Sequence, residues 1–316
     1  MAIKLLIGGS PCTHWSIAQK NNRETEPSGM GWELFKNYLI AKEKFKPDFF
    51  LYENNKSAAQ AIKDQIAKEL GVGVDPKVRF TYINSALVSA QNRQRFYVTN
   101  FGDIEQPKDR GILLKDILEY GFDLSQRDKS YCLTATYNGA TAINTLERKQ
   151  RPMVAESWDG KTYPVYEVRN GLIEIKGKTY PIGLPDGYYI IRKLTVTECC
   201  RLQTLPDDYC KAVSATQGYK GLGNGWTAEV IIHLLNHALK DIPRNEEIVV
   251  LSLYDGIGTG RYCLDKMGFT NVKYYAYEID KYPMTIANDN YPDIIQCGDA
   301  FAVREDSWKP PLGVSK

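Results

Sequence analysis

Residues 248–263 read IVVLSLYDGIGTGRYC, an apolar run that passes at once into a glycine-rich turn. The apolar run predicts a short buried strand, and Gly256, Gly258 and Gly260 allow the backbone to approach a ligand closely where that strand ends. The turn does not continue with the GxGxxG spacing of a pyrophosphate site. The stretch therefore predicts the first strand, turn and helix of a doubly wound α/β domain that binds a nucleoside without a diphosphate.

Two more predicted strands follow this turn, and each ends in an acidic residue. Residues 272–280 (VKYYAYEID) carry Glu278, which lies 20 residues after Gly258, and residues 294–300 (IIQCGDA) carry Asp299. A carboxylate at the first position can accept hydrogen bonds from two ribose hydroxyls, and a carboxylate at the second from an adenine amino group. S-adenosylmethionine fits this pattern, and a NAD-type site is the alternative that the turn alone leaves open.

The first 101 residues alternate between strands and helices. Apolar runs predict the strands, and apolar residues at helical spacing predict the helices between them. The predicted strands are 3–8, 47–54, 78–88 and 94–101, and the predicted helices are 32–45 and 58–71. This alternation favours a mostly parallel sheet. The polar, glycine-containing stretch 13–31 is interpreted either as a lid over the site or as a disordered connection.

The sequence changes character between residues 102 and 191, where Tyr, Thr and Gly become frequent and apolar residues alternate with polar ones. Asn170-Gly171 lies between two alternating runs and predicts a tight hairpin. Helices are predicted again at 195–203 and 226–239, before a polar linker at 241–247. We therefore predict three regions, which are 1–101, a smaller β-rich domain at 102–191, and 192–316, whose cofactor-binding half is 248–300.

Chemically reactive side chains follow the predicted strands of the first region. Cys12 comes directly after a Gly-Gly-Ser-Pro turn, where a thiol is partly exposed, as a nucleophile requires. Glu53 lies at the end of the next strand, and Arg93 and Arg95 are expected on one face of a third. A thiol, a carboxyl group and two guanidinium groups are thus predicted at neighbouring strand ends.

These motifs, in this order, resemble those of the DNA cytosine-C5 methyltransferase family. The resemblance lies in Pro11-Cys12, Glu53-Asn54, Gln91/Arg93/Arg95, residues 192–209, Gly223-Asn224, residues 254–260, Glu278 and Asp299. Family members usually begin with the glycine-rich motif, whereas this chain begins with the Pro-Cys motif and has the glycine-rich motif last. The chain therefore looks like a circular permutant, an arrangement that is tolerated where termini lie near each other at the surface.

The resemblance implies a fold, a reaction and a set of site residues. The fold would be a Rossmann-like, S-adenosylmethionine-dependent methyltransferase sheet in permuted order, with a smaller β-rich target-recognition domain at 102–191. The reaction would methylate C5 of a cytosine flipped out of double-stranded DNA at a short sequence, through a covalent bond between Cys12 and C6. The catalytic residues would be Cys12, Glu53, Arg93 and Arg95. Cofactor contacts would come from Pro11, Asn224, Trp226, Tyr254, Asp255, Gly256, Gly258, Thr259, Gly260, Glu278, Ile279 and Asp299. DNA contacts would come from Gln91, Arg127, Lys129, Arg148, Lys149 and Arg151.

Two other functions fit the same motifs. One is an RNA cytosine-C5 methyltransferase of the same architecture, and the other is a catalytically silent DNA-binding relative. The long middle region favours DNA over RNA as the substrate. The presence of Cys12, Glu53 and both arginines favours an active enzyme.

Composition sets wider limits on the partners and the compartment. The 316 residues carry 40 basic and 38 acidic side chains, so DNA would have to be met by a local basic face. The seven cysteines form no CxxC pair, which argues against a disulfide framework and against a structural metal site. The apolar runs are too short for a signal segment or a membrane span. We expect a metal-free, cytoplasmic, nucleoid-associated monomer in a bacterial or phage-infected cell, with any cognate restriction endonuclease acting separately from it.

Overall fold

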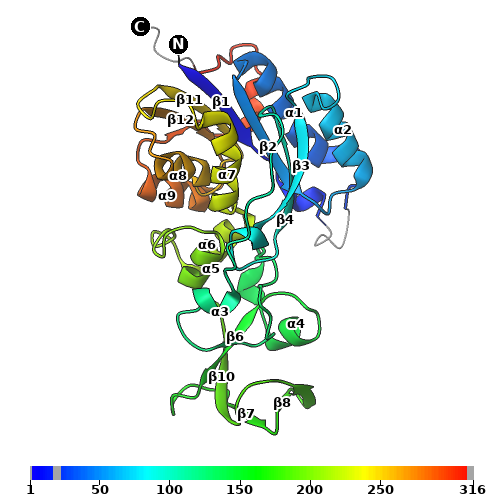
Figure 1. The fold of residues 1–316 in the computed structure, drawn as a ribbon, viewed down its shortest axis with the longest axis vertical. Helices are drawn as coiled ribbons and strands as arrows, with labels where there is room; N and C mark the ends of the chain where they lie inside the picture. The colour runs from blue at the N-terminus through cyan, green and yellow to red at the C-terminus, as the bar shows by residue number, and fades with distance from the viewer. Residues whose placement is uncertain (1, 17–22, 312–316) are drawn as a thin grey trace. The chain divides into compact units, whose positions relative to one another are not determined.

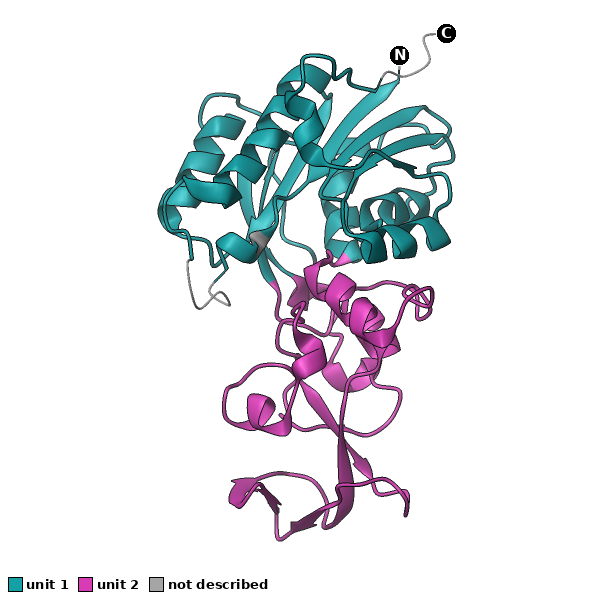
Figure 2. Ribbon diagram, turned by 180° about the vertical axis from the view of Figure 1, so that it is seen from behind, with its two compact units in different colours: residues 1–84, 94–107, 228–316 teal, residues 85–93, 108–227 magenta. Residues whose placement is uncertain are grey.

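The computed structural model describes residues 2–16 and 23–311, except for the side chain of Cys12. Part of the stretch predicted as a lid, residues 17–22, lies outside the described residues. Contacts divide the chain into two compact units (Figure 2). Unit 1 contains residues 1–84, 94–107 and 228–316, and unit 2 contains residues 85–93 and 108–227. Unit 2 therefore extends beyond the predicted β-rich domain at 102–191.

Unit 1 is built on a seven-stranded sheet with the strand order β13-β12-β11-β1-β2-β4-β3 (Figure 1). β4 is antiparallel to both neighbours, whereas the other neighbouring pairs are parallel, so the prediction of a mostly parallel sheet is confirmed. The elements of this unit are β1 (Ile3–Gly8), η1 (Cys12–His14), α1 (Gly29–Phe45), β2 (Phe49–Asn55), α2 (Gln60–Leu70), β3 (Arg79–Asn84), β4 (Gln94–Thr99), α7 (Ala228–Leu239), β11 (Ile248–Leu253), α8 (Thr259–Lys266), β12 (Val272–Tyr277), α9 (Lys281–Asn290), β13 (Ile295–Gln296) and η4 (Ala300–Arg304).

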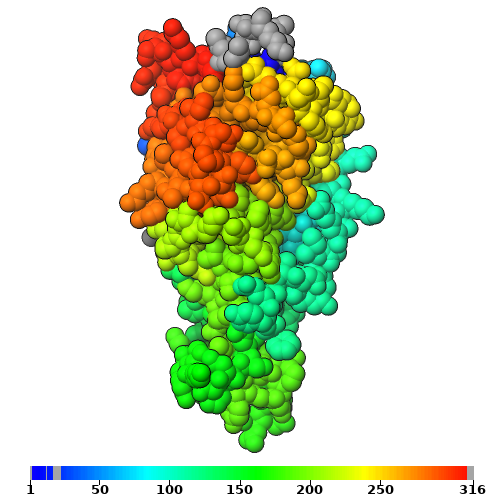
Figure 3. All heavy atoms as spheres, turned by 90° about the vertical axis from the view of Figure 1, so that its left-hand side faces the viewer, coloured from blue at the N-terminus to red at the C-terminus, as the bar shows by residue number. Residues whose placement is uncertain are grey.

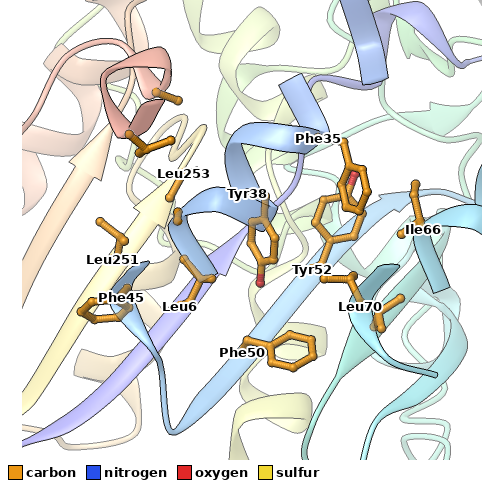
Figure 4. Packing of buried hydrophobic residues seen from close by; sticks show 14 of the residues in the cluster. Leu6, Phe35, Tyr38, Phe45, Phe50, Tyr52, Ile66, Leu70, Leu251 and Leu253 are labelled. Carbon is orange, nitrogen blue, oxygen red and sulfur yellow. The ribbon is translucent and has the colours of Figure 1, made fainter. Parts of the chain in front are cut away.

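Helices cover both faces of this sheet. On one face, Phe35 and Tyr38 of α1 and Ile66 of α2 pack with Leu6 of β1 and Tyr52 of β2 in one buried cluster (Figure 4). On the other face, α8 and α9 form the outer surface that Figure 3 shows in orange. The apolar area buried on both faces is the main source of stability for a sheet of this kind.

Unit 2 contains a six-stranded antiparallel sheet with the strand order β5-β6-β10-β7-β8-β9. The turn between β7 and β8 has positive φ angles of 50° at Asn170 and 69° at Gly171, which confirms the predicted hairpin. The elements of this unit are η2 (Ser85–Leu87), α3 (Leu114–Ile117), β5 (Phe122–Asp123), η3 (Tyr137–Gly139), α4 (Ala142–Leu146), β6 (Met153–Ser157), β7 (Tyr166–Arg169), β8 (Leu172–Ile175), β9 (Lys178–Pro181), β10 (Gly187–Lys193), α5 (Val196–Leu202) and α6 (Ala215–Asn224).

A buried ionic contact explains why α5 belongs to unit 2. Glu198 of α5 is fully buried, and Arg192 of β10 donates to its two carboxylate oxygens at 2.8 and 2.9 Å. The backbone N–H of Glu119 also donates to Glu198, at 2.9 Å. A buried carboxylate needs such donors, and here they come from the β-rich part of the unit. The segment after residue 191 is therefore joined to the predicted β-rich domain.

Several element boundaries differ from those predicted. α1 begins at Gly29, earlier than predicted, and the strand predicted at 78–88 ends at Asn84 before the 3-10 turn η2. α6 is not predicted by the sequence, because its three internal glycines lower helix propensity. Within the described parts of the chain, the structure has no helix long and apolar enough to cross a membrane.

Candidate active site

Four parallel strands of unit 1 end at one edge of the sheet, which we call the carboxyl edge. Backbone register places Gly8 of β1, Tyr52 of β2, Leu253 of β11 and Tyr277 of β12 side by side. Because these strands run in the same direction, the residues that follow them all emerge at this edge. Most of the unit 1 residues predicted for catalysis and cofactor binding therefore lie along one edge of one sheet.

Hydrogen bonds hold the segment between β1 and Cys12 against β2. Ser10 Oγ lies 2.8 Å from the Tyr52 hydroxyl oxygen, and Asn54 Nδ2 donates to the Ser10 carbonyl oxygen at 2.9 Å. Burial raises the pKa of the Tyr52 hydroxyl, which therefore stays protonated and able to donate. These bonds fix the backbone that carries the predicted nucleophile.

The turn itself passes close to Glu53. An added Cβ at Gly9 would lie 2.3 Å from the Glu53 carbonyl oxygen and 3.1 Å from Glu53 Oε2, so only glycine fits there. Pro11 follows, and the backbone of Cys12 begins η1. The side chain of Cys12 lies outside the described residues, and its role as nucleophile stays a prediction.

Glu53 forms an ion pair with Arg95 across β2 and β4. Arg95 Nε lies 2.9 Å from Glu53 Oε1, and the two side chains are only 11% and 12% exposed. Arg95 reaches Glu53 because β4 is antiparallel to β2 and pairs Arg95 with Asn55, two residues further along β2. A carboxyl group and a guanidinium group thus meet at the carboxyl edge, beside the turn that leads to Cys12.

Arg93 does not share this site. β4 begins at Gln94, so the expectation that Arg93 and Arg95 lie on one face of a strand is wrong. The Arg93 side chain is 3% exposed and donates to three carbonyl oxygens in unit 2, those of Leu133 at 2.9 Å, Gly223 at 3.2 Å and Gly225 at 2.7 Å. These hydrogen bonds make Arg93 a positioning residue for the turn at the end of α6, and its contact with substrate stays a prediction.

Replacing Arg93 by leucine is expected to lower the free energy of unfolding by about 3–5 kcal/mol, because buried carbonyl oxygens lose their charged donor. Urea denaturation followed by circular dichroism measures this change. The matched change at the exposed Arg148 should shift the free energy by less than about 0.5 kcal/mol. Equally small effects at both positions would contradict the positioning role.

Two residues predicted to contact DNA form hydrogen bonds within unit 2. Gln91 is fully buried, and its Nε2 donates to the Leu202 carbonyl oxygen at 2.7 Å and to Gln203 Oε1 at 2.9 Å. Lys129 is half-buried, and its Nζ donates at 2.5–3.1 Å to three carbonyl oxygens, which belong to Ala86, Ser89 and Ile112. These polar groups already have hydrogen-bond partners within unit 2, and the contact of both residues with DNA stays a prediction.

The other predicted DNA contacts remain available at the surface of unit 2. Arg148 and Lys149 are exposed, and the exposed Arg127 places its guanidinium carbon 4.8 Å from the centre of the Tyr131 ring. Arg151 is half-buried and donates to the Gly139 carbonyl oxygen at 3.0 Å. Their contact with DNA stays a prediction.

The glycine-rich turn after β11 adopts an unusual backbone. Tyr254, Gly256 and Gly258 have positive φ angles of 60°, 66° and 77°. Asp255 lies inside this turn, where its Oδ1 accepts hydrogen bonds from Ser252 Oγ at 2.7 Å and from the Tyr274 hydroxyl at 2.6 Å. These two bonds tie the turn to the strands on either side of it.

Gly260 is needed where the helix after this turn crosses the sheet. A Cβ at Gly260 would lie 2.4 Å from the Tyr274 hydroxyl oxygen, the same group that reaches Asp255. Asp255 Oδ2 and Thr259 Oγ1 are buried and have no hydrogen-bond partner among the described residues. The turn therefore combines a close backbone approach with polar atoms whose hydrogen-bonding capacity is unused, as a nucleoside site requires.

Carboxylates and one exposed apolar side chain complete a set of groups that fits S-adenosylmethionine. Glu278 directly follows β12, and its Oε2 accepts from the Gly256 backbone N–H at 3.0 Å. Ile279, which follows it, is 73% exposed, an exposure that suits contact with a flat aromatic base. Asp299 is exposed just after β13. Asn224 and Trp226 belong to unit 2, and their assignment to the cofactor stays a prediction.

Asp255 supplies a testable pH dependence. Burial, with the nearby Glu278 carboxylate, raises the pKa of the Asp255 carboxyl to about 6. The folded protein therefore binds this proton more tightly than the unfolded chain does. The resulting stabilisation is complete below about pH 4 and is lost as the pH rises through about 6.

Asp255→Asn is expected to remove this pH dependence, because an amide keeps an acceptor for Ser252 and Tyr274 and carries no charge. Relative to the variant, the wild type should lose about 1–3 kcal/mol of unfolding free energy between about pH 4 and pH 7. Urea denaturation at several pH values measures the difference. The exposed Asp241→Asn serves as the matched control, and a D255N profile parallel to that of D241N would contradict the assignment.

Sequence reasoning missed the residues that hold the site in place. Tyr52 and Ser10 fix the Pro-Cys turn, and Ser252 and Tyr274 fix Asp255. The available signal was a hydroxyl-bearing residue inside an otherwise apolar strand, as in IVVLSL at 248–253. Such a residue needs a buried partner, which the sequence alone does not identify.

Comparison of the sequence with known proteins assigns the chain to a family. The family described as C-5 cytosine-specific DNA methylase matches residues 1–240. The chain is 25% identical over 276 residues to the Type II methyltransferase M.FnuDI of Fusobacterium nucleatum, covering 77% of this chain and 78% of that protein. It is also 25% identical over 258 residues to the Type II methyltransferase M.Bsp6I of Bacillus sp., covering 75% of this chain and 79% of that protein.

Among solved structures, the Entamoeba histolytica methyltransferase EhMeth matches with a TM-score of 0.48 and 13% identity, covering 76% of this chain and 78% of that one. The sequence match shows the family, because its residues 1–240 make up well over half of the 316 residues. The residues of the Pro-Cys turn and the Glu53–Arg95 pair lie inside the matched range. This chain belongs to the C-5 cytosine-specific DNA methylase family.

Proposed function

We propose that the protein transfers a methyl group from S-adenosylmethionine, the methyl donor of its family, to C5 of a cytosine flipped out of double-stranded DNA at a short sequence. The observation that carries this proposal is the Glu53–Arg95 ion pair at the carboxyl edge, with its oxygen and nitrogen 2.9 Å apart. The Gly9 backbone, which leads to Cys12, lies against the same Glu53. A carboxyl group, a guanidinium group and a thiol-bearing turn are the groups that this chemistry needs at one place.

The proposed mechanism assigns a task to each residue. The Cys12 thiolate forms a bond to C6, and the electron pair of the C5–C6 double bond becomes available at C5. Glu53 holds a proton at N3, so that negative charge does not build up on the ring, and Arg95 keeps the Glu53 carboxyl in place. S-adenosylmethionine, when bound, would supply the methyl group to C5, and its positively charged sulfur would keep the electron pair of the broken S–CH3 bond and leave as a neutral thioether. A base then removes the C5 proton, and Cys12 leaves as the double bond re-forms.

Base flipping is part of this proposal because C6 and N3 of a stacked, paired cytosine cannot be reached by protein side chains. Unit 2 is proposed to recognise the DNA sequence, with Arg148, Lys149 and Arg127 as candidate contacts. Support comes from their exposure and from the cation–ring contact between Arg127 and Tyr131. Cationic and aromatic side chains of this kind suit contact with phosphates and base edges.

The permuted order of motifs is also proposed. It is supported by the sheet, in which β1 pairs in parallel with β11, the strand of the glycine-rich turn, although residues 9–247 separate them. The strand that leads to the predicted nucleophile thus lies beside the strand that leads to the cofactor site, although the second strand comes much later in the sequence.

The test of function is expression in a host that lacks DNA methylation, followed by sequencing after chemical conversion of unmodified cytosine. Protected cytosines at one short sequence, absent from the empty-vector control, are the expected result. The same conversion is applied to total RNA. Protection in RNA alone would establish the RNA alternative, and protection in neither, with folded protein present, would overturn the proposed function.

A further inference from the structure

Two lysine ammonium groups lie over one tyrosine ring near the carboxyl edge of the unit 1 sheet. Lys56 Nζ is 5.3 Å from the centre of the Tyr82 ring, and Lys63 Nζ is 5.6 Å from it. Lys56 follows β2, Lys63 belongs to α2, and Tyr82 belongs to the edge strand β3. We call these three residues the Lys56–Lys63–Tyr82 cluster. An aromatic ring attracts one cation, but the second ammonium group adds repulsion that the ring does not cancel.

The charge of Lys63 is costly where it lies. Lys63 is only 8% exposed, and its Nζ donates to the Lys56 carbonyl oxygen at 3.3 Å. Throughout the described part of the chain, neither Lys56 nor Lys63 has a carboxylate oxygen within 4.0 Å of its Nζ. A mostly buried cation without an opposite charge is unfavourable, and an anion bound beside it would lower that cost.

The cluster is accessible and fixed in place. Lys56 is exposed, and Tyr82 is 38% exposed. The Tyr82 ring packs on Phe80, with ring centres 5.1 Å apart, and Gln106 Nε2 donates to the Tyr82 carbonyl oxygen at 2.8 Å. An anion arriving from solvent would therefore meet the exposed Lys56 ammonium group on a tyrosine ring that is already in position, with Lys63 Nζ 5.6 Å from the centre of the same ring.

The cluster is also adjacent to the proposed catalytic pair. Lys56 comes directly after Asn55, which pairs with Arg95, and the Lys56 backbone N–H donates to the Gln94 carbonyl oxygen at 3.4 Å. Tyr82 pairs with Phe96, the residue after Arg95, so its side chain lies on the opposite face of the sheet from Glu53 and Arg95, near the same carboxyl edge. A polyanion that follows the carboxyl edge, with its target base at Glu53, would thus meet the cluster on the other face of the sheet at that edge. This continuity favours a DNA strand over an isolated small anion as the occupant.

We propose that the Lys56–Lys63–Tyr82 cluster binds a backbone phosphate of the DNA strand that carries the target cytosine. The proposal rests on the proposed function and adds a DNA contact in unit 1 besides those of the predicted catalytic residues. Phosphate contacts position DNA without reading its sequence, so the cluster should affect affinity equally at all recognition sites. The two ammonium groups supply the charge, and the tyrosine ring holds them together.

The experiment measures DNA affinity against salt concentration for the wild type and for Lys56→Ala, on the duplex that conversion sequencing identifies. Each neutralised phosphate contributes about 0.9 to the slope of log K against log[salt]. The Lys56→Ala slope should therefore be shallower by about 0.9. As a result, the ratio of wild-type to variant DNA affinity should fall about threefold between about 50 and about 200 mM NaCl. In methyl transfer, KM for DNA should rise while kcat at saturating DNA stays near the wild-type value. Lys56→Arg should restore both properties.

The matched control is Lys68→Ala, which removes an exposed lysine from the last turn of α2, away from the cluster. Lys63→Met gives a second measurement, because it should raise the melting temperature of the free protein while making the salt slope shallower. Wild-type slopes for both Lys56→Ala and Lys63→Met would overturn the cluster as a phosphate site. Wild-type protein that binds and methylates no DNA would instead overturn the proposed function itself.

Discussion

Replacing Cys12 by alanine is expected to abolish methyl transfer, with a fall in kcat of about a thousandfold or more, because the proposed mechanism needs the Cys12 thiolate to form the bond to C6. The same variant should no longer be trapped on DNA containing 5-fluorocytosine, where a covalent complex normally accumulates because fluorine cannot leave as a proton does. Denaturing gel electrophoresis of the protein–DNA complex measures trapping, and transfer of a labelled methyl group measures kcat.

Binding of S-adenosylmethionine should survive this change, because the glycine-rich turn is held by Ser252 and Tyr274 and not by the Pro-Cys turn. Cys132→Ala serves as the matched control, since Cys132 is a half-buried thiol in unit 2. It should retain both transfer and trapping. A Cys12→Ala protein that is still trapped on the modified DNA would remove Cys12 from its assigned role.

Replacing Glu53 by glutamine is expected to lower kcat by about 10²–10⁴-fold while affinity for DNA changes little. The amide keeps the shape of the side chain and can still accept a hydrogen bond from Arg95 Nε, but it cannot hold and release a proton at N3. Single-turnover kinetics at saturating DNA and cofactor separate this chemical effect from binding.

Glu247→Gln is the matched control, because Glu247 also forms an ion pair, with Lys273 Nζ 2.7 Å from its Oε1. Lys273 lies in the first part of β12, so this pair is at the opposite edge of the sheet from Glu53. The control should transfer methyl groups at the wild-type rate. Equal rates for E53Q and the wild type would refute proton transfer by Glu53.

The sequence predicted much of unit 1 because its strands are apolar runs whose ends carry the chemistry. The strands that contain IKLLIG and IVVLSL are buried, and parallel strands bring their ends to one edge without further information. This reasoning was sufficient to predict that Glu53 and Glu278 lie at strand ends.

What the sequence could not predict depends on contacts between distant segments. Arg93 and Arg95 look equivalent two residues apart, but β4 begins between them, and Arg93 turns to the carbonyl oxygens of Gly223 and Gly225. Gln91 and Lys129 look like surface polar residues until their backbone partners are known. A long polar side chain becomes buried where it can donate to carbonyl groups that otherwise lack a donor. These carbonyl groups lie far away in the sequence, and no local sequence pattern identifies them.

The pairing of β1 with β11 has a consequence for the synthesis of the protein in the cell. β1 emerges from the ribosome early, yet the strand that covers one of its two edges follows only after residues 9–247 have been made. Leu5, Leu6 and Ile7 are fully buried in the finished sheet, so until then an apolar strand has an open edge to which other chains can add. Unit 2 has all of its residues before unit 1 does. We therefore expect the nascent chain to be prone to association through this open strand edge until the cofactor-binding half has been made.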